Sequence, residues 1–162
     1  MSDSPKVLIL MGSVSDADLM RTCWQQLAEF GVESEVRVAS AHRTPDLVAE
    51  LVGGAAARGV GVIIAGAGWA AHLAGAVAAN TTLPVIAVPL ATSSLQGLDA
   101  LLSSVQMPAG VPVATVSING SRNAAILAAQ ILALSDEALS ARIADLRASQ
   151  AEKIRNLTVD QT

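Results

Sequence analysis

Apolar runs alternate along the chain with stretches of helical spacing. The run at residues 6–11 (KVLILM) is almost continuously apolar, which is typical of a strand buried on both faces. Further strands are predicted at residues 60–65, 84–89 and 112–117. Residues 33–39 alternate polar and apolar positions, which indicates a strand at an edge of the sheet. The pattern therefore predicts five strands.

Helices are predicted between these strands. Met20, Cys23, Trp24 and Leu27 fall at i, i+3, i+4 and i+7 and form one apolar stripe, and Gly31 can end that helix in the left-handed conformation. The other predicted helices are one opened by Pro45, an alanine-rich one ending near Asn80, residues 98–105, residues 123–134 with Ser121 as N-cap, and a last helix capped by Ser135.

The last predicted helix carries a narrow apolar stripe made by Leu139, Ile143 and Leu146. Such a stripe on an otherwise polar helix indicates packing on a neighbouring subunit rather than on the crowded core of its own chain. We therefore expect this helix to take part in assembly.

Strict alternation of strands and helices predicts an α/β fold, with one doubly wound parallel sheet between two layers of helices. In such sheets ligands bind outside the carboxyl ends of the strands, where the strand order reverses. The loops at residues 12–16, 40–45 and 66–72 leave the first three strands at that edge. With the strand order 2-1-3-4-5, all three loops converge.

Composition changes this picture in only a few respects. The 162 residues suit a single domain, and with 52% hydrophobic and 15% charged residues we expect a homo-oligomer. The net charge of −4 argues against nucleic acid as a partner. The single cysteine, Cys23, fits a reducing cytoplasm and is interpreted as a core residue.

Neither the first residues of the chain nor its most apolar stretch indicates a membrane protein. Residues 1–6 are short and polar, without the pattern of a signal peptide. Residues 60–79 are nearly as long as a membrane span, but their glycines divide them into strand, loop and helix. We expect no membrane association.

The densest group of reactive side chains is Ser40-Ala41-His42-Arg43-Thr44-Pro45. Arg43 offers a planar fork that suits phosphate, and His42 can move protons near neutral pH. Ser13 and Asp16 precede the first helix, where they can cap it or can bind a phosphate and a ribose diol. The residues leave both interpretations open.

Several other classes of site find little support. Residues 66–71 formally match G-x-G-x-x-A, but they follow the third strand, and no acidic residue about twenty positions later could hold a ribose. The segment is better read as a small-residue loop whose N–H groups can approach an anion. The sequence has neither a Walker motif nor a G-x-S-x-G elbow, and its two histidines lack the neighbours of a metal site. A flavin carrier is also disfavoured.

Five motifs in this order and spacing resemble the bacterial PurE family: GSxSD, SAHRTP, GAGxAAHL, LPVIxVP and VQMPAGVPVATV. The resemblance spans about residues 6–134, within a single domain of residues 1–162 whose C-terminal helix and tail are residues 135–162. It implies a flavodoxin-like fold, a homo-octamer with active sites at subunit junctions, and no cofactor or metal. Members are N5-carboxyaminoimidazole ribonucleotide mutases of purine biosynthesis, which move a carboxylate from N5 to C4 through bound CO2.

The resemblance also implies a role for individual residues. Ser13, Ser40 and Arg43 would hold the ribotide phosphate, Asp16 would bind the ribose hydroxyls, and His42 would be the general acid and base. The loop that would enclose the imidazole and the migrating carboxylate contributes Gly66, Ala67, Gly68, Ala70, His72 and Leu73.

Three positions depart from the family pattern, which usually has Gly at Trp69, Pro at Ala74 and Gly at Ala87. Trp69 places a large ring inside the carboxylate-enclosing loop. Two alternatives to a mutase are an aminoimidazole ribonucleotide carboxylase that uses free CO2 and a ribotide-binding module whose CO2 site Trp69 blocks.

Overall fold

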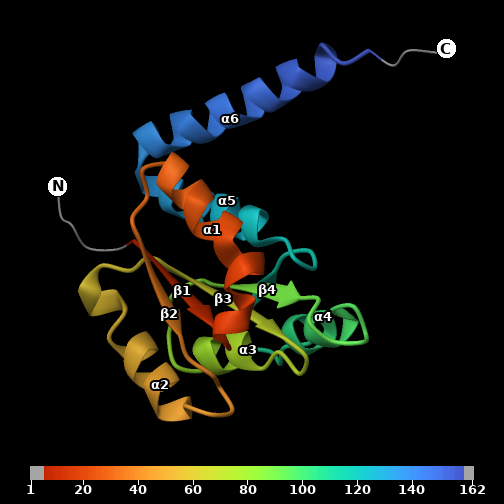
Figure 1. Cartoon of the computed structure of the whole chain (residues 1–162). Helices are drawn as coiled ribbons and strands as arrows, with labels where there is room; N and C mark the ends of the chain where they lie inside the picture. Colours follow the sequence, from red (N-terminus) through yellow and green to blue (C-terminus); the bar gives the residue numbers. More distant parts are fainter. Residues whose placement is uncertain (1–5, 159–162) are drawn as a thin grey trace.

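The computed structural model describes residues 6–158, so the expectations for the signal-free N-terminus and for the end of the tail lie partly outside it. Its centre is a five-stranded, fully parallel sheet in the predicted order β2-β1-β3-β4-β5 (Figure 1). The strands are β1 (Val7–Met11), β2 (Ser34–Val38), β3 (Val62–Gly68), β4 (Val85–Leu90) and β5 (Ala114–Thr115).

Helices cover both faces of the sheet, as the alternating pattern predicted. They are α1 (Ala17–Glu29), α2 (Pro45–Gly53), α3 (Leu73–Ala78), α4 (Leu98–Val105), α5 (Ser121–Leu132) and α6 (Glu137–Arg155), with short 3-10 turns η1 (Val14–Asp16), η2 (Ala56–Arg58) and η3 (Ala133–Ser135). Together with the sheet they make the predicted three layers.

The alternation of side chains along β1 divides the core into two parts. Val7, Ile9 and Met11 pack with residues of α1, α5 and the start of α6 on one face. Leu8 and Leu10 pack with residues of α2 and α3 on the other. All five residues of β1 are buried, because the strand lies between two others and under helices on both sides.

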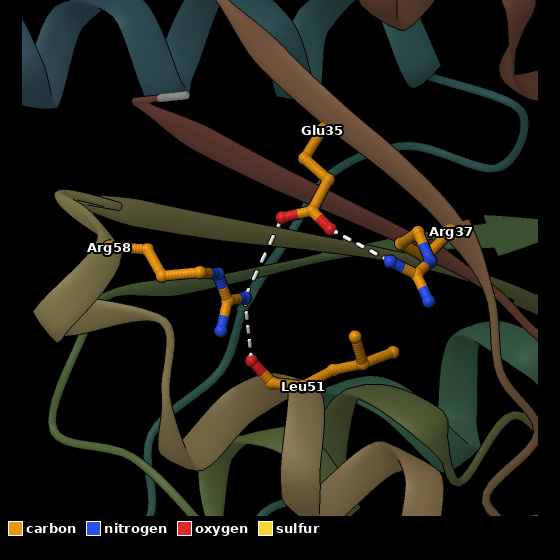
Figure 2. A network of polar contacts seen from close by, with 4 residues as sticks. All are labelled: Glu35, Arg37, Leu51 and Arg58. Carbon is orange, nitrogen blue, oxygen red and sulfur yellow. Dashed lines mark hydrogen bonds and ion pairs between the residues drawn. The ribbon is translucent and has the colours of Figure 1, made fainter. Parts of the chain in front are cut away.

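The edge position of β2 is confirmed, and the strand carries charge there. The Glu35 carboxylate lies 3.1 Å from Nη1 of Arg37 and 3.6 Å from Nη2 of Arg58, while Arg58 also donates to the Leu51 carbonyl at 2.9 Å (Figure 2). These side chains tie the edge strand to the end of α2. Charged side chains on an edge strand disfavour pairing with another chain.

Several predicted boundaries are wrong. β3 runs to Gly68 rather than Ala65, because Gly66 pairs with Met11 and Gly68 with Leu90. β5 is limited to two residues, at the other edge of the sheet. The N-cap of α5 is Gly120, since the Ser121 hydroxyl pairs instead with Thr22 and the Leu19 carbonyl.

The N-cap of α6 is also displaced by one residue. Asp136, not Ser135, accepts a hydrogen bond from the Leu139 N–H at 2.9 Å. Both residue types cap well, so the sequence could not choose between neighbours.

The stripe on α6 does not lie free for a neighbour. Leu139 and Ile143 are buried against the core of this chain, and Leu146 packs beside them, which corrects the sequence-based expectation. Beyond that point α6 extends away from the body, and Ile154 is exposed (Figure 1). Packing on a neighbouring subunit stays a prediction for this outer part. Within residues 6–158 no helix is both long and apolar enough to cross a membrane.

Candidate active site

The turns that follow β1, β2 and β3 meet around one cavity of about 620 Å³ at the carboxyl edge of the sheet. The sequence predicted this convergence from the strand order. The residues lining the cavity are Gly12, Ser13, Ser15, Asp16, Ser40, Ala41, His42, Arg43, Ala67, Gly68, Trp69, Ala70, His72, Leu73 and Thr92.

The turn after β1 is held by a capping box. The Ser13 N–H donates to Oδ2 of Asp16 at 3.1 Å, and the Ser13 hydroxyl accepts from the Ser15 N–H at 3.3 Å. Asp16 is only 6% exposed. Burial raises the pKa of Asp16, against the Ser13 N–H and the Arg43 charge, which lower it. Ser13 and Asp16 therefore both cap the turn and line the cavity.

The turn after β2 is tied to the turn after β1 through Arg43. Its Nη2 donates to the Gly12 carbonyl at 2.7 Å, and its Nε donates to the Ser40 hydroxyl at 3.3 Å. The Ser40 N–H in turn donates to Oγ1 of Thr44 at 3.0 Å, just before Pro45 opens α2. The guanidinium is thus oriented by two turns, with its remaining N–H groups free of those contacts.

His42 and His72 form a pair that the sequence did not predict. Nε2 of His42 and Nδ1 of His72 lie 2.8 Å apart, and the rings meet edge to face at 79° with centroids 4.9 Å apart. One nitrogen donates and the other accepts, so a neutral pair has its tautomers coupled. The arrangement can hold or pass one proton at the cavity wall.

Small residues predominate, as predicted, from the end of β3 through the third turn to the start of α3. Ala67, Gly68, Ala70 and Leu73 line the cavity. Gly66 is absent from the lining; it lies in β3, where an added Cβ would come within 2.5 Å of the Met20 sulfur. Gly66 therefore serves close packing between the sheet and α1.

Trp69 stands out in this turn. Its φ of 54° is in the left-handed region that favours glycine, and its side chain is 64% exposed at the cavity. The sequence singled out this residue but could not give its backbone conformation.

Sequence reasoning also missed some of the lining. Thr92 follows β4 and lies against Gly68, whose Cβ, if present, would overlap the threonine hydroxyl. Gly12 offers its carbonyl to Arg43. Thr92 could have been predicted from the sequence, because it follows the carboxyl end of β4, the strand next to β3.

The described residues 6–158 hold neither a cluster of metal ligands nor an accessible cysteine thiol. Across residues 6–158 no three His, Cys, Asp or Glu side chains gather as a metal site requires. Cys23 is buried, and burial raises the pKa of its thiol to about 12. Its interpretation as a core residue is confirmed.

This chain is similar over most of its length to proteins that share one name. The N5-carboxyaminoimidazole ribonucleotide mutase of Mycobacterium tuberculosis (strain CDC 1551 / Oshkosh) is 57% identical over 141 residues, covering 87% of this chain and 81% of the relative. The Mycobacterium leprae (strain TN) protein of the same name is 51% identical over 160 residues, covering 99% and 94%.

A solved structure has the same fold as this chain. The crystal structure of Treponema denticola PurE superposes with a TM-score of 0.85 at 34% identity, covering 93% of this chain and 94% of that one. The model of the AIR carboxylase family matches residues 6–153. The resemblance found in the five motifs is confirmed, and the chain belongs to the AIR carboxylase family, which includes the PurE proteins.

Proposed function

We propose that this protein is an isomerase of purine biosynthesis that converts N5-carboxyaminoimidazole ribonucleotide into 4-carboxy-5-aminoimidazole ribonucleotide. The observation that carries the proposal is one cavity lined by Asp16 from the turn after β1, by His42 and Arg43 from the turn after β2, and by His72 from the turn after β3. Relatives at 51–58% identity that bear the mutase name support the choice of reaction.

The turns after β1 and β2 would bind the phosphate and ribose of the substrate. Arg43 is oriented by Gly12 and Ser40, which leaves N–H groups for phosphate oxygens, and the hydroxyls of Ser13 and Ser40 line the same cavity. The Asp16 carboxylate, when ionised, can accept from both ribose hydroxyls. Apart from Asp16, Arg43 and the two histidines, the residues that line the cavity carry no ionisable side chain.

The histidine pair would carry the proton that the reaction exchanges. The N5–carboxylate bond breaks to release CO2, and His42 gives a proton to N5. The C4 carbon then bonds to that CO2, and the proton lost from C4 returns to His42, so the enzyme ends as it began. His72, at 2.8 Å, supports the proposal because it fixes the tautomer of His42 and can share its proton.

The small-residue turn would keep the CO2 in place. Ala67, Gly68, Ala70 and Leu73 present apolar or backbone surface to the cavity, which disfavours water near an uncharged gas. Holding CO2 beside C4 makes the second bond effectively intramolecular, an advantage of several kcal/mol.

The proposal is tested with the purified protein and N5-carboxyaminoimidazole ribonucleotide, followed by absorbance with and without bicarbonate. Isomerisation without bicarbonate is the expected result. A strict need for added bicarbonate would make the protein a carboxylase that uses free CO2, and no turnover with ribotide bound would make it a binding module.

His42→Asn provides the matching residue test. The substitution should lower turnover by at least about 100-fold, the usual contribution of a positioned acid–base group, while ribotide binding by calorimetry remains. Asn occupies a similar volume but cannot carry the proton. Wild-type turnover in the variant would remove His42 from the mechanism.

Assembly into a homo-octamer in the cytoplasm belongs to the same proposal. The low charge content supports it, as do exposed leucines on and beside α4, Leu95, Leu98 and Leu102. Light scattering should give a mass several times the 16.4 kDa of one chain. A monomer at micromolar concentration would contradict it.

A further inference from the structure

Trp69 combines three properties that stabilisation of the fold does not explain. It is a large aromatic residue with 64% of its surface exposed, its φ of 54° is rarely adopted by bulky residues, and it lies at the cavity rather than in the core. Trp24, the other tryptophan, packs normally against the core between the sheet and α1. A residue held in this way has no evident role in stabilising the fold.

The neighbours of Trp69 indicate which part of a ligand it can reach. It stands between Gly68 and Ala70, three residues before His72, so it belongs to the turn that contributes one member of the histidine pair. The phosphate-binding candidates belong to the other two turns. An indole on the third turn can face the heteroaromatic ring of a bound nucleotide rather than its phosphate.

We infer that Trp69 is a substrate-covering residue whose indole packs on the aminoimidazole ring and closes the cavity over the migrating CO2. The inference rests on the proposed function for the identity of the ligand. Aromatic rings gain from stacking beyond the area that they bury, and covering the ring excludes water from the place where the gas is held. The exposed surface of Trp69 in the ligand-free chain is then the surface that the substrate buries.

The first test follows the tryptophan itself. In a Trp24→Phe background Trp69 is the only tryptophan, so its fluorescence reports on one side chain. Saturating aminoimidazole ribonucleotide should shift its emission and reduce its quenching by acrylamide by at least about twofold. Inorganic phosphate, which occupies only the Arg43 side, should leave the quenching unchanged. Equal quenching with and without bound ribotide, with binding verified by calorimetry, would overturn the inference.

The second test follows the carboxylate. Substrate labelled with carbon-13 in the carboxylate is converted in unlabelled bicarbonate, and mass spectrometry gives the label retained in the product. Trp69→Gly should lose label at least about threefold more often per turnover and bind ribotide about two- to tenfold more weakly. Trp69→Phe, which keeps a ring, should stay near the wild type.

The glycine variant is expected to fold, because glycine adopts φ of 54° without strain. Its melting temperature should therefore equal or exceed that of the wild type. Full label retention by Trp69→Gly would refute the covering role of Trp69 but would not contradict the proposed mutase activity. If the wild type itself shows no isomerisation, the proposed function fails, and the fluorescence test alone then decides whether Trp69 covers the ribotide.

Discussion

Replacing Arg43 by lysine keeps the positive charge but removes the planar fork. In the wild type Nη2 donates to the Gly12 carbonyl at 2.7 Å and Nε to the Ser40 hydroxyl at 3.3 Å, so the guanidinium joins two turns and still has N–H groups for a phosphate. A lysine ammonium can satisfy the carbonyl or the phosphate, but its flexible stem cannot hold both turns.

The size of the effect follows from the bonds that are lost. A hydrogen bond to a charged group contributes about 1.5–3 kcal/mol, and the loss of one such bond between residue 43 and the phosphate corresponds to a rise in KM of about 10- to 150-fold. Turnover at saturation should change less than about threefold, because the proposed proton carriers are His42 and His72 rather than Arg43.

Steady-state kinetics on the ribotide substrate measure both quantities. Arg37→Lys is the matched control, since Arg37 lies on β2 in the Glu35 network and does not line the cavity (Figure 2). Its KM should equal that of the wild type. If Arg43→Lys left KM unchanged, or lowered turnover without raising KM, the assignment of Arg43 to the phosphate would be wrong.

Three further outcomes can be measured on the folded chain. Because burial raises the pKa of Asp16 above its usual 3.8, the folded chain binds this proton more tightly; the resulting stability is present at low pH and is lost as pH rises through the raised pKa. Between the ordinary and the raised pKa of Asp16, the melting temperature of Asp16→Asn should therefore rise relative to that of the wild type as pH increases. A constant difference in melting temperature between the two proteins over this pH range would contradict the predicted sign. Cys23, with its pKa raised to about 12 by burial, should resist alkylation at pH ~8 until the protein unfolds; rapid labelling of native protein would argue against a closed core. Gly68→Ala would place a Cβ 3.2 Å from the Leu90 carbonyl and overlapping the Thr92 hydroxyl, so urea unfolding should show a loss of about 1–3 kcal/mol, partly restored by adding Thr92→Ala; full wild-type stability of the single variant would refute this contact.

The strand order and the convergence of three turns followed from the sequence because both depend on coarse features. Continuous apolar runs mark buried strands, alternation marks the edge strand β2, and right-handed crossovers leave few ways to connect them. Ser40, His42 and Arg43 could be placed at the same edge as Asp16 on this basis alone.

The finer geometry could not be read in the same way. His42 and His72 are 30 residues apart, and their contact depends on how two turns pack rather than on any local spacing. The end of β3 at Gly68 is fixed by pairing with β4, which a glycine-containing segment does not reveal. At the start of α6, adjacent Ser135 and Asp136 are equally good caps, and only the fold decides between them.

The position of β1 ties the binding site to the integrity of the whole sheet. The turns bearing Ser13, Ser40 and Ala70 become neighbours only after β1 has paired with β2 on one side and β3 on the other. A fragment that lacks one of these three strands cannot present the whole cavity, so a ribotide bound as we propose would contact all three turns only in the native state. Ligand at about 100 times its dissociation constant should then add about 2.7 kcal/mol to the stability of the protein, which makes a thermal-shift titration a direct measure of occupancy.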